Sequence, residues 1–276
     1  MPTAKTAYER RRELLKERNA FRYVKNAERV YATQLRRVAR HVGELVAAFD
    51  PKNPRHVHRL VDLLHRYAEV LTPWARATAS KLITEVSRRD EKAWARYGAE
   101  LGLELKEQLR TAPVGAELAK LLDEQVTLIT SLPVEAGRRV QRLATEAITD
   151  PTRWTELAAE IMRTGAVTQS RANTIARTET SRAASGLTQI RATHLGSPGY
   201  QWVSILDADT RPAIGSKNFA SMNTLAKGSH RKLNGTIHRW DEPPIAAPDG
   251  TRAHPGGIYN CRCFAIPILP ASLTGN

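Results

Sequence analysis

Two cysteines near the C-terminus, Cys261 and Cys263, are the residues whose type and spacing suggest chemistry first. If both lie in a strand, their side chains project from the same face, so the two thiols lie together. Two thiolates on one face can share a Zn²⁺ ion, with His230 and His254 or His238 as further ligands of a tetrahedral site. A disulfide across one intervening residue would close a very tight ring. The alternative to a metal site is plain packing of buried cysteines in a core.

The run Arg177-Thr178-Glu179, within a predicted helix, is the second candidate. Residues two apart on a helix diverge by about 200°, so Arg177 and Glu179 cannot act as one catalytic pair. We interpret the run as a tether, in which ion pairs from the helix orient a small β unit. The candidate partners are Arg262 for Glu179 and Asp209 for Arg177.

Known catalytic patterns are incomplete in this sequence. A zinc deaminase needs His-x-Glu and Pro-Cys-x-x-Cys, and a nucleotide hydrolase needs a phosphate-binding glycine-rich loop. The stretch from His238 to Asn260 resembles a His-Asn-His nuclease only in part, because the second metal-binding histidine is absent. Cys261 with His230 could form a thiol catalyst, although cysteine here is more typical of a ligand or a core residue. We therefore expect no enzymatic activity.

Regular apolar spacing from Phe21 to Phe49 predicts a long helix with a heptad stripe, interrupted once by Glu28. The stripe faces either a partner helix or the core of its own domain. Pro51 and Pro54 end the helix, because proline cannot continue one and restrains the residue before it.

Further helices are predicted through the middle of the chain. Pro73 and Pro151, each after a capping residue, indicate helix starts, and Thr168 or Ser170 caps a later helix that stops at Gly196. The expected helices cover residues 73–88, 90–110, 115–131 and 133–148, followed by the helix that runs through Leu195.

The pattern after Gly196 changes to β-branched and aromatic runs. Strands are predicted over 200–206 and 258–266, and Asn234-Gly235 within 232–238 is a hairpin signal. Long loops at 207–230 and 239–257, rich in Gly, Pro, Ser and Asp, join these elements.

The predicted fold class is α+β, with largely helical N-terminal and middle regions followed by a small C-terminal α+β domain with long loops. Its expected domains are a basic helix with the heptad stripe at 1–50, a helical bundle at 51–130 and a mixed domain at 131–276.

Positive charge is concentrated at the two ends of the chain. The net charge is +14, and residues 1–50 and 166–276 each contribute +6 while the middle is nearly balanced. Such clusters attract polyanions such as nucleic acid, or an acidic protein surface. No stretch approaches the roughly 20 apolar residues of a membrane helix, so we expect no membrane association. The candidate nucleic-acid or partner contacts are Arg10, Arg11, Arg12, Arg18, Arg22, Arg36 and Arg37.

The run Arg177-Thr178-Glu179 is followed in order by Trp202, Asp209, Arg211, His230, Gly235 and the run Asn260-Cys261-Arg262-Cys263. This ordered set resembles the head-morphogenesis domain of phage Mu protein F-like minor head proteins. The resemblance covers about residues 130–270, and the His254-Pro255 pair lies further upstream of Asn260-Cys261 than is usual in the family. Besides the two cysteines and His230, the motif residues are Arg177, Thr178, Glu179, Trp202, Asp209, Arg211, Gly235, Asn260 and Arg262.

The resemblance implies a structural virion protein without catalysis. It implies a minor capsid protein inside the head of a tailed phage, present in the host cytoplasm during assembly. The implied partners are the portal protein, the major capsid protein and double-stranded DNA bound without sequence preference. The alternative is a DNA-acting enzyme, a metal-dependent nuclease or a toxin domain, on the same scaffold. A structural Zn²⁺ is the one cofactor considered.

Overall fold

The structure is a computed structural model of the whole chain, and it describes residue 21 and residues 25–50, 54–206, 210 and 228–274. Several residues singled out in the sequence lie outside the described ones: Arg10, Arg11, Arg12, Arg18, Arg22, Asp209 and Arg211.

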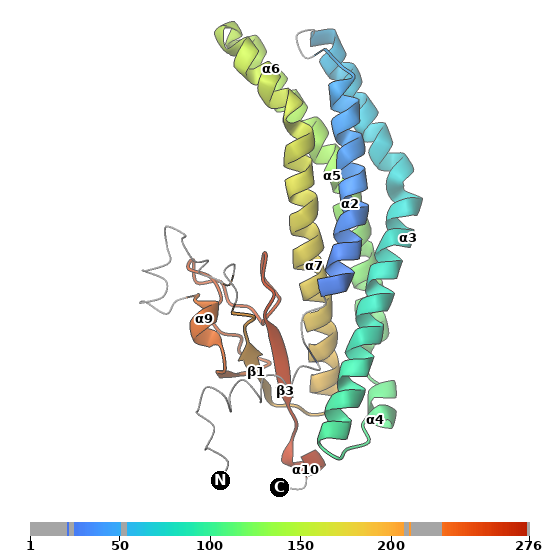
Figure 1. Cartoon of the computed structure of the whole chain (residues 1–276), viewed down its shortest axis with the longest axis vertical. Coiled ribbons are helices and arrows are strands. Elements are labelled where there is room, and N and C mark those ends of the chain that lie inside the picture. Colours follow the sequence, from blue (N-terminus) through green and yellow to red (C-terminus); the bar gives the residue numbers. More distant parts are fainter. Residues whose placement is uncertain (1–20, 22–24, 51–53, 207–209, 211–227, 275–276) are drawn as a thin grey trace, which may run out of the picture. The chain divides into compact units, whose positions relative to one another are not determined.

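Long helices make up most of the described chain, and a small sheet lies near its C-terminus (Figure 1), which confirms the predicted fold class. No described helix is long and apolar enough to cross a membrane. The helices are α2 (Lys25–Ala47), α3 (Pro54–Glu100), α4 (Lys106–Arg110), α5 (Val114–Thr149), α6 (Trp154–Met162), α7 (Thr164–His194), α9 (His230–Leu233) and α10 (Ala271–Thr274). A 3-10 turn, η2 (Pro151–Arg153), precedes α6, and the strands are β1 (Gly199–Val203), β2 (Ile237–Arg239) and β3 (Phe264–Ile268).

The predicted helix start at Pro73 is wrong, because Pro73 lies inside the 47-residue helix α3. Pro73 is exposed, so the carbonyl group that loses its hydrogen-bond partner can face solvent, while Leu71 and Ala75 on either side are buried. Pro133 likewise lies inside α5. Packing of the apolar face holds these helices together across residues that locally disfavour them. The four helices expected between 73 and 148 are therefore parts of two long helices and the short α4.

Internal contacts divide the described residues into two compact units. Unit 1 contains Phe21, Glu85–Glu117 and the residues from Thr180 onward, and unit 2 contains Lys25–Thr84 and Leu118–Glu179. Helices α3, α5 and α7 each contribute residues to both units. This division groups residues differently from the consecutive segments 1–50, 51–130 and 131–276, whose boundaries remain predictions.

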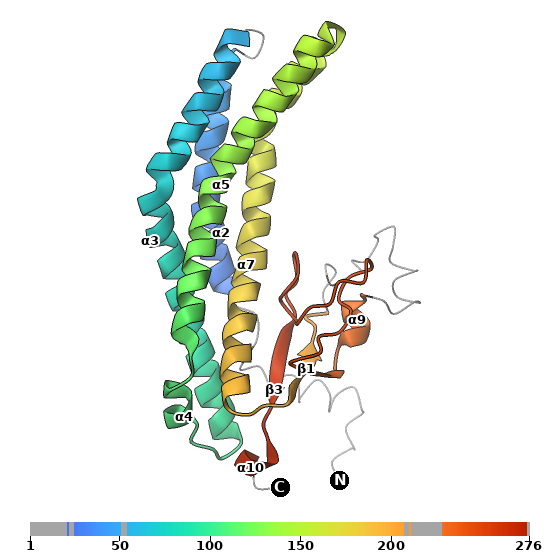
Figure 2. The same cartoon turned by 180° about the vertical axis from the view of Figure 1, so that it is seen from behind.

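Unit 2 is a helical bundle in which α2 lies beside α3 and α7, as both views show (Figure 1 and Figure 2). The apolar stripe of α2 is buried from Tyr31 to Val46. It therefore packs within its own unit, the second of the two interpretations of the heptad pattern. Its core is formed by Val42, Val46, Val57, Leu60, Val61, Leu64, Ala136, Val140, Leu143, Ala144, Ala147, Leu157 and Ile161.

Two glycines, Gly43 in α2 and Gly165 in α7, allow these helices to approach closely. A Cβ added at Gly165 would lie 2.7 Å from the Gly43 Cα, whereas one added at Gly43 would lie 3.5 Å from the Gly165 Cα. Gly165→Ala should therefore lower the free energy of unfolding by about 1–3 kcal/mol, because backbone must move. Gly43→Ala should be neutral or stabilising by up to about 1 kcal/mol, since alanine favours the helix. Urea unfolding of both variants tests this, and equal effects would contradict the close approach.

Unit 1 contains the antiparallel sheet, ordered β2-β1-β3. Tyr200 and Trp202 of the central strand β1 are fully buried. The second half of α3 belongs to the same core through Trp94 and Tyr97, and the Tyr97 hydroxyl donates a hydrogen bond to the Pro267 carbonyl at 2.7 Å. The small α+β unit thus depends on helical residues far earlier in the chain than 131.

The two predicted strand regions after β1 differ in detail from the structure. Lys232 and Leu233 are helical, so the turn at Gly235, with φ +85°, joins α9 to β2 and does not join two strands. The region 258–266 begins as a turn, with Asn260 at φ +56°, and the strand starts only at Phe264. The two cysteines therefore precede β3, and the turn, not a pleated strand, sets the direction of their thiols.

Candidate metal centre

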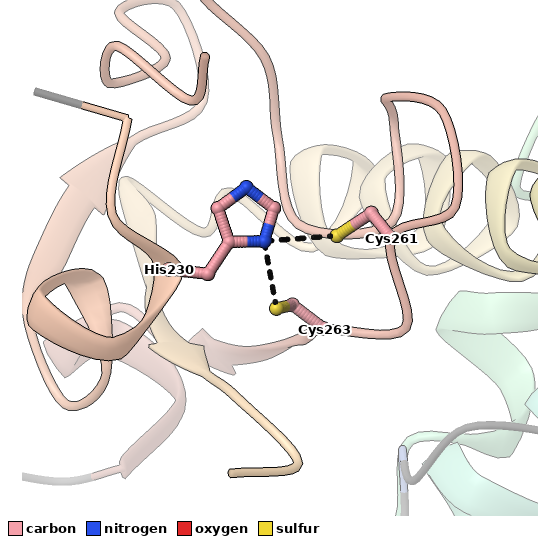
Figure 3. A group of neighbouring side chains, drawn as sticks. All are labelled: His230, Cys261 and Cys263. Atoms are coloured by element: carbon pink, nitrogen blue, oxygen red, sulfur yellow. Dashed lines mark hydrogen bonds between the residues drawn. The ribbon is translucent and has the colours of Figure 1, made fainter. Parts of the chain in front are cut away.

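His230, Cys261 and Cys263 form a compact group in unit 1, with their side chains pointing toward one another (Figure 3). His230 Nδ1 lies 3.5 Å from Cys261 Sγ and 3.4 Å from Cys263 Sγ. All three residues are buried, with exposed fractions of 2%, 3% and 6%. His230 begins α9, whose preceding Ser229 caps the helix by accepting a hydrogen bond from the Lys232 amide. The arrangement brings one imidazole to two thiols from distant parts of the chain.

Hydrogen bonds around the group orient its atoms. His230 Nε2 lies 3.0 Å from the Ala246 carbonyl oxygen, an acceptor, so Nε2 carries the proton and Nδ1 presents its lone pair to the sulfurs. The Gly256 amide donates to Cys261 Sγ at 3.3 Å, and Cys263 Sγ lies 3.4 Å from the Ser204 hydroxyl oxygen. The Ser204 hydroxyl in turn donates to the His230 carbonyl at 2.5 Å. Such outer contacts are typical of side chains that bind a metal.

The two thiols have opposite acidities. The side-chain hydrogen bond with Cys263 lowers the pKa of Cys261, and its contact with His230 lowers it further. Burial raises the pKa of Cys263, and the neighbouring Cys261 raises it again. A bound cation would favour the deprotonated form of both thiols.

The distances agree with a shared tetrahedral ion. With Zn–S near 2.3 Å and Zn–N near 2.1 Å, sulfur and nitrogen ligands are separated by about 3.6 Å. The two distances here are 3.5 and 3.4 Å. A cavity of about 60 Å³ is bordered by all three residues, which leaves room for a water as a fourth ligand. Among the described residues, the group can thus hold a metal ion through three protein ligands.

His254, the fourth predicted ligand, belongs to another network. Its Nδ1 lies 3.0 Å from the Tyr200 hydroxyl and its Nε2 lies 3.3 Å from Gln189 Nε2. His238 contacts the Thr236 hydroxyl at 2.6 Å. An aromatic cluster of Tyr200 and Trp240 holds the His254 ring at centroid distances of 5.4 and 5.6 Å. The structure therefore unites three of the four predicted ligands, and His254 is not one of them.

Other motif residues surround the same group. The Trp202 ring packs edge-on against His230, with ring centroids 5.2 Å apart. The Gly235 amide donates to the Trp202 carbonyl at 2.7 Å. Asn260 and Arg262 line the cavity beside the thiols. Trp202, Asn260 and Arg262 thus border the centre, and Gly235 contacts it only through Trp202.

Arg177, Thr178 and Glu179 lie in α7 within unit 2. Glu179 is 5% exposed and accepts a hydrogen bond from the Gln125 amide at 3.1 Å. Arg177 forms an ion pair with Glu28 at 3.5 Å, whereas its predicted partner Asp209 lies outside the described residues. Both contacts join helices of unit 2, so the interpretation of the run as a tether to the β unit stays a prediction, as does the pair between Glu179 and Arg262.

The buried partners of Glu179 carry no local signal in the sequence. The Tyr31 hydroxyl donates to Gln125 Oε1 at 2.9 Å across 94 positions of the chain. Burial raises the pKa of Tyr31, and the Glu179 charge raises it further. Only the packing of α2, α5 and α7 brings these three residues together.

A buried ion pair in unit 1 was also missed by sequence reasoning. The Arg191 guanidinium contacts the Asp90 carboxylate, and both side chains are 4% exposed. The Thr188 hydroxyl donates to Asp90 at 2.5 Å, and Arg191 also pairs with Glu91 at 3.1 Å. Burial raises the pKa of Asp90 to about 6, although Arg191 and Thr188 act in the opposite direction. The pair joins α3 to α7 within one core.

Arg36 and Arg37 are the two predicted polyanion contacts within the described residues. Arg36 is half-buried and donates to Asn173 Oδ1 at 3.0 Å, and Arg37 is exposed and donates to Gln34 Oε1 at 3.2 Å. Both partners are neutral, so neither positive charge is compensated by these contacts.

The chain is similar to an uncharacterized protein of Haemophilus influenzae (strain KW20 Rd), with 31% identity over 189 residues. The aligned region spans 67% of this chain and 38% of that relative. No family model and no solved structure matches the chain.

Proposed function

We propose that the protein is a structural minor head protein of a tailed phage that lies inside the head near the portal. There it bridges the portal protein, the major capsid protein and packaged DNA. The ordered motif set resembles phage Mu protein F-like proteins, and one observation favours a structural role for that set. Trp202 packs against His230 of the buried His-Cys-Cys group, Asn260 and Arg262 line the cavity beside it, and Gly235 donates to the Trp202 carbonyl. Such an arrangement suits a staple that stabilises a small unit with long loops.

The proposal includes a structural Zn²⁺ held by His230, Cys261 and Cys263. Two thiolates and one imidazole suit zinc, because sulfur and nitrogen are its preferred ligands and two negative charges balance the ion. The bound ion would hold α9 to the turn before β3. Buried cysteines and histidine then serve stability and not reactivity.

Heads purified from a strain that produces this chain test the assignment. Quantitative mass spectrometry should find the chain in DNA-filled heads at few copies relative to the major capsid protein. Cross-linking should join it to the portal or capsid protein, and deletion of its gene should reduce the yield of filled heads. Recovery of the chain only outside particles, with normal head assembly in the deletion strain, would contradict the proposal.

Three protein ligands beside a cavity also resemble a catalytic zinc site, which keeps one position open. This observation favours a metal-dependent nuclease as the second candidate. Incubation of the purified protein with supercoiled plasmid and Zn²⁺, Mg²⁺ or Mn²⁺ distinguishes the two. Cleavage that His230→Gln abolishes would replace the structural role with the enzymatic one.

A further inference from the structure

The outward face of α2 carries a row of arginines. Each residue turns a helix by about 100°, so Arg29, Arg36 and Arg40 lie within about 40° of one another, opposite the buried stripe. Their Cα atoms extend over about 16 Å of helix at a rise of about 1.5 Å per residue. Arg29 and Arg40 are exposed and Arg36 is half-buried. The row is therefore accessible along three turns of the helix.

No carboxylate neutralises this row among the described residues. Arg29 contacts Asn26 Oδ1 at 3.2 Å. Within the part of the chain that the structure describes, Arg36 contacts only Asn173 and Thr33, and Arg40 makes no hydrogen bond or ion pair. The two acidic residues of α2 are engaged elsewhere. Glu28 pairs with Arg177 at 3.5 Å, and Glu44 pairs with His41 at 3.2 Å.

The neighbouring helix α3 extends the unpaired charge. The His41 and Tyr67 rings, with centroids 4.6 Å apart, place the two helices in contact. Arg59 and Arg66 are seven residues apart, so they share one face of α3. Both are exposed, and neither makes a hydrogen bond or ion pair within the described part of the chain.

The rest of unit 2 has a different balance of positive and negative residues. Residues 25–84 carry 11 Lys and Arg against 5 Asp and Glu, whereas residues 118–179 carry 8 against 8. Five of the seven arginines in the second group lie next to carboxylates, with N–O distances between 2.5 and 3.1 Å. Those pairs are Arg139–Glu160, Arg142–Glu146, Arg153–Glu156, Arg163–Glu160 and Arg171–Glu135. Among the described residues, positive charge without a carboxylate partner is thus concentrated on α2 and α3, with exposed Arg138 of α5 as an exception.

We propose that the arginines of α2 and α3 form a binding surface for the phosphate backbone of double-stranded DNA, without reading its sequence. Arg29, Arg36 and Arg40 form its centre, and Arg59 and Arg66 extend it. DNA presents a phosphate every few ångströms along either strand, so a linear row of cations always meets several of them. An acidic protein would need carboxylates at matching positions. The inference rests on the proposed function, in which packaged DNA is the partner, and it names the surface that makes the contact.

Two triple variants of the full chain test the surface. Arg29→Gln/Arg36→Gln/Arg40→Gln removes three unpaired charges, and Arg142→Gln/Arg153→Gln/Arg163→Gln removes three paired ones, so the net charge is the same in both. Fluorescence anisotropy with two unrelated 30-bp duplexes gives affinity as a function of salt. The α2 variant should bind DNA at least about tenfold more weakly at low salt. The slope of log binding constant against log salt concentration should become smaller in magnitude by up to about 2.7, since each lost phosphate contact removes about 0.9. The control should retain the wild-type slope.

Further variants and measurements distinguish a wrong binding surface from a wrong assignment to the phage head. Arg29→Lys/Arg36→Lys/Arg40→Lys should keep most of the affinity, because it keeps the charge, and circular dichroism should show all variants folded. The proposed surface would be contradicted by any of three results. These are an equal loss of DNA affinity in both Gln variants, an unchanged DNA affinity in the α2 variant, or stronger binding to polyglutamate than to DNA. Absence of the chain from heads, with DNA binding that depends on the row, would instead overturn the head assignment alone.

Discussion

Cys261→Ser and His230→Gln should each remove the bound zinc and unfold much of unit 1. The purified wild type should contain about one zinc per chain, and either variant should contain close to none, because only two ligands remain. A structural zinc site can supply much of the folding free energy of a small unit, so we expect a loss on the order of 5 kcal/mol. Elemental analysis and thermal unfolding followed by circular dichroism measure both effects. Prolonged treatment of the wild type with a chelator should reproduce them.

His254→Gln is the matched control for His230→Gln. Both replace a histidine of unit 1, but His254 contacts Tyr200 and Gln189 and lies outside the group that can hold a metal. The control should keep its zinc and lose only its contacts with Tyr200 and Gln189, each worth about 1 kcal/mol. The metal site would be contradicted by a wild type without zinc, or by a Cys261→Ser variant whose free energy of unfolding changes by less than about 1 kcal/mol. Either result would indicate that the cysteines only pack in the core.

Arg191→Met should destabilise unit 1 by about 3–5 kcal/mol, because it leaves the Asp90 carboxylate buried without its cation. Asp90 is 6% exposed and Arg191 is 3% exposed, so water cannot replace the lost partner. Asp90→Asn is the milder control, since Arg191 keeps its contact with Glu91 at 3.1 Å. Urea unfolding at neutral pH compares the two. A larger loss for Asp90→Asn would contradict this account of the pair.

The same residue predicts a dependence on pH. Burial raises the pKa of Asp90 from 3.8 to about 6, so between these values the folded state binds more protons than the unfolded state. The contribution of Asp90 to stability is therefore greatest at low pH and is lost as pH rises through about 6. The stability difference between wild type and Asp90→Asn should fall from pH 4 to pH 6, by at most about 1.4 kcal/mol per pH unit. A difference that grows over this range would show that Arg191 outweighs burial.

Local sequence patterns predicted the long helix α2 and the end of the helical region. The apolar stripe from Tyr31 to Val46 matches the buried face of α2, and Gly196, with φ +77°, lies just after α7 as predicted. The proline signal failed at Pro73, and the helix expected to begin at residue 133 is part of α5, because long buried faces outweigh the loss of one helical hydrogen bond. Local preference acts over a few residues, whereas burial sums over the whole helix.

For the candidate metal centre, the sequence by itself determined the ligand types and placed two cysteines close together in the chain. Their convergence comes from the turn at Asn260 and not from the strand that the pattern predicted. The sequence offers His230 and His254 equally as metal ligands, and only the tertiary structure decided which histidine lies beside the thiols. The cap at Ser229 and the Ala246 carbonyl aim His230 at the sulfurs, and Tyr200 holds His254 away. The pairs Asp90–Arg191 and Gln125–Glu179 likewise exist only after folding, because residues separated by 101 and 54 positions meet through helix packing that no local pattern encodes. The sequence determined the total charge as well, but only the fold decided which arginines would find a carboxylate and which would remain unpaired on α2 and α3.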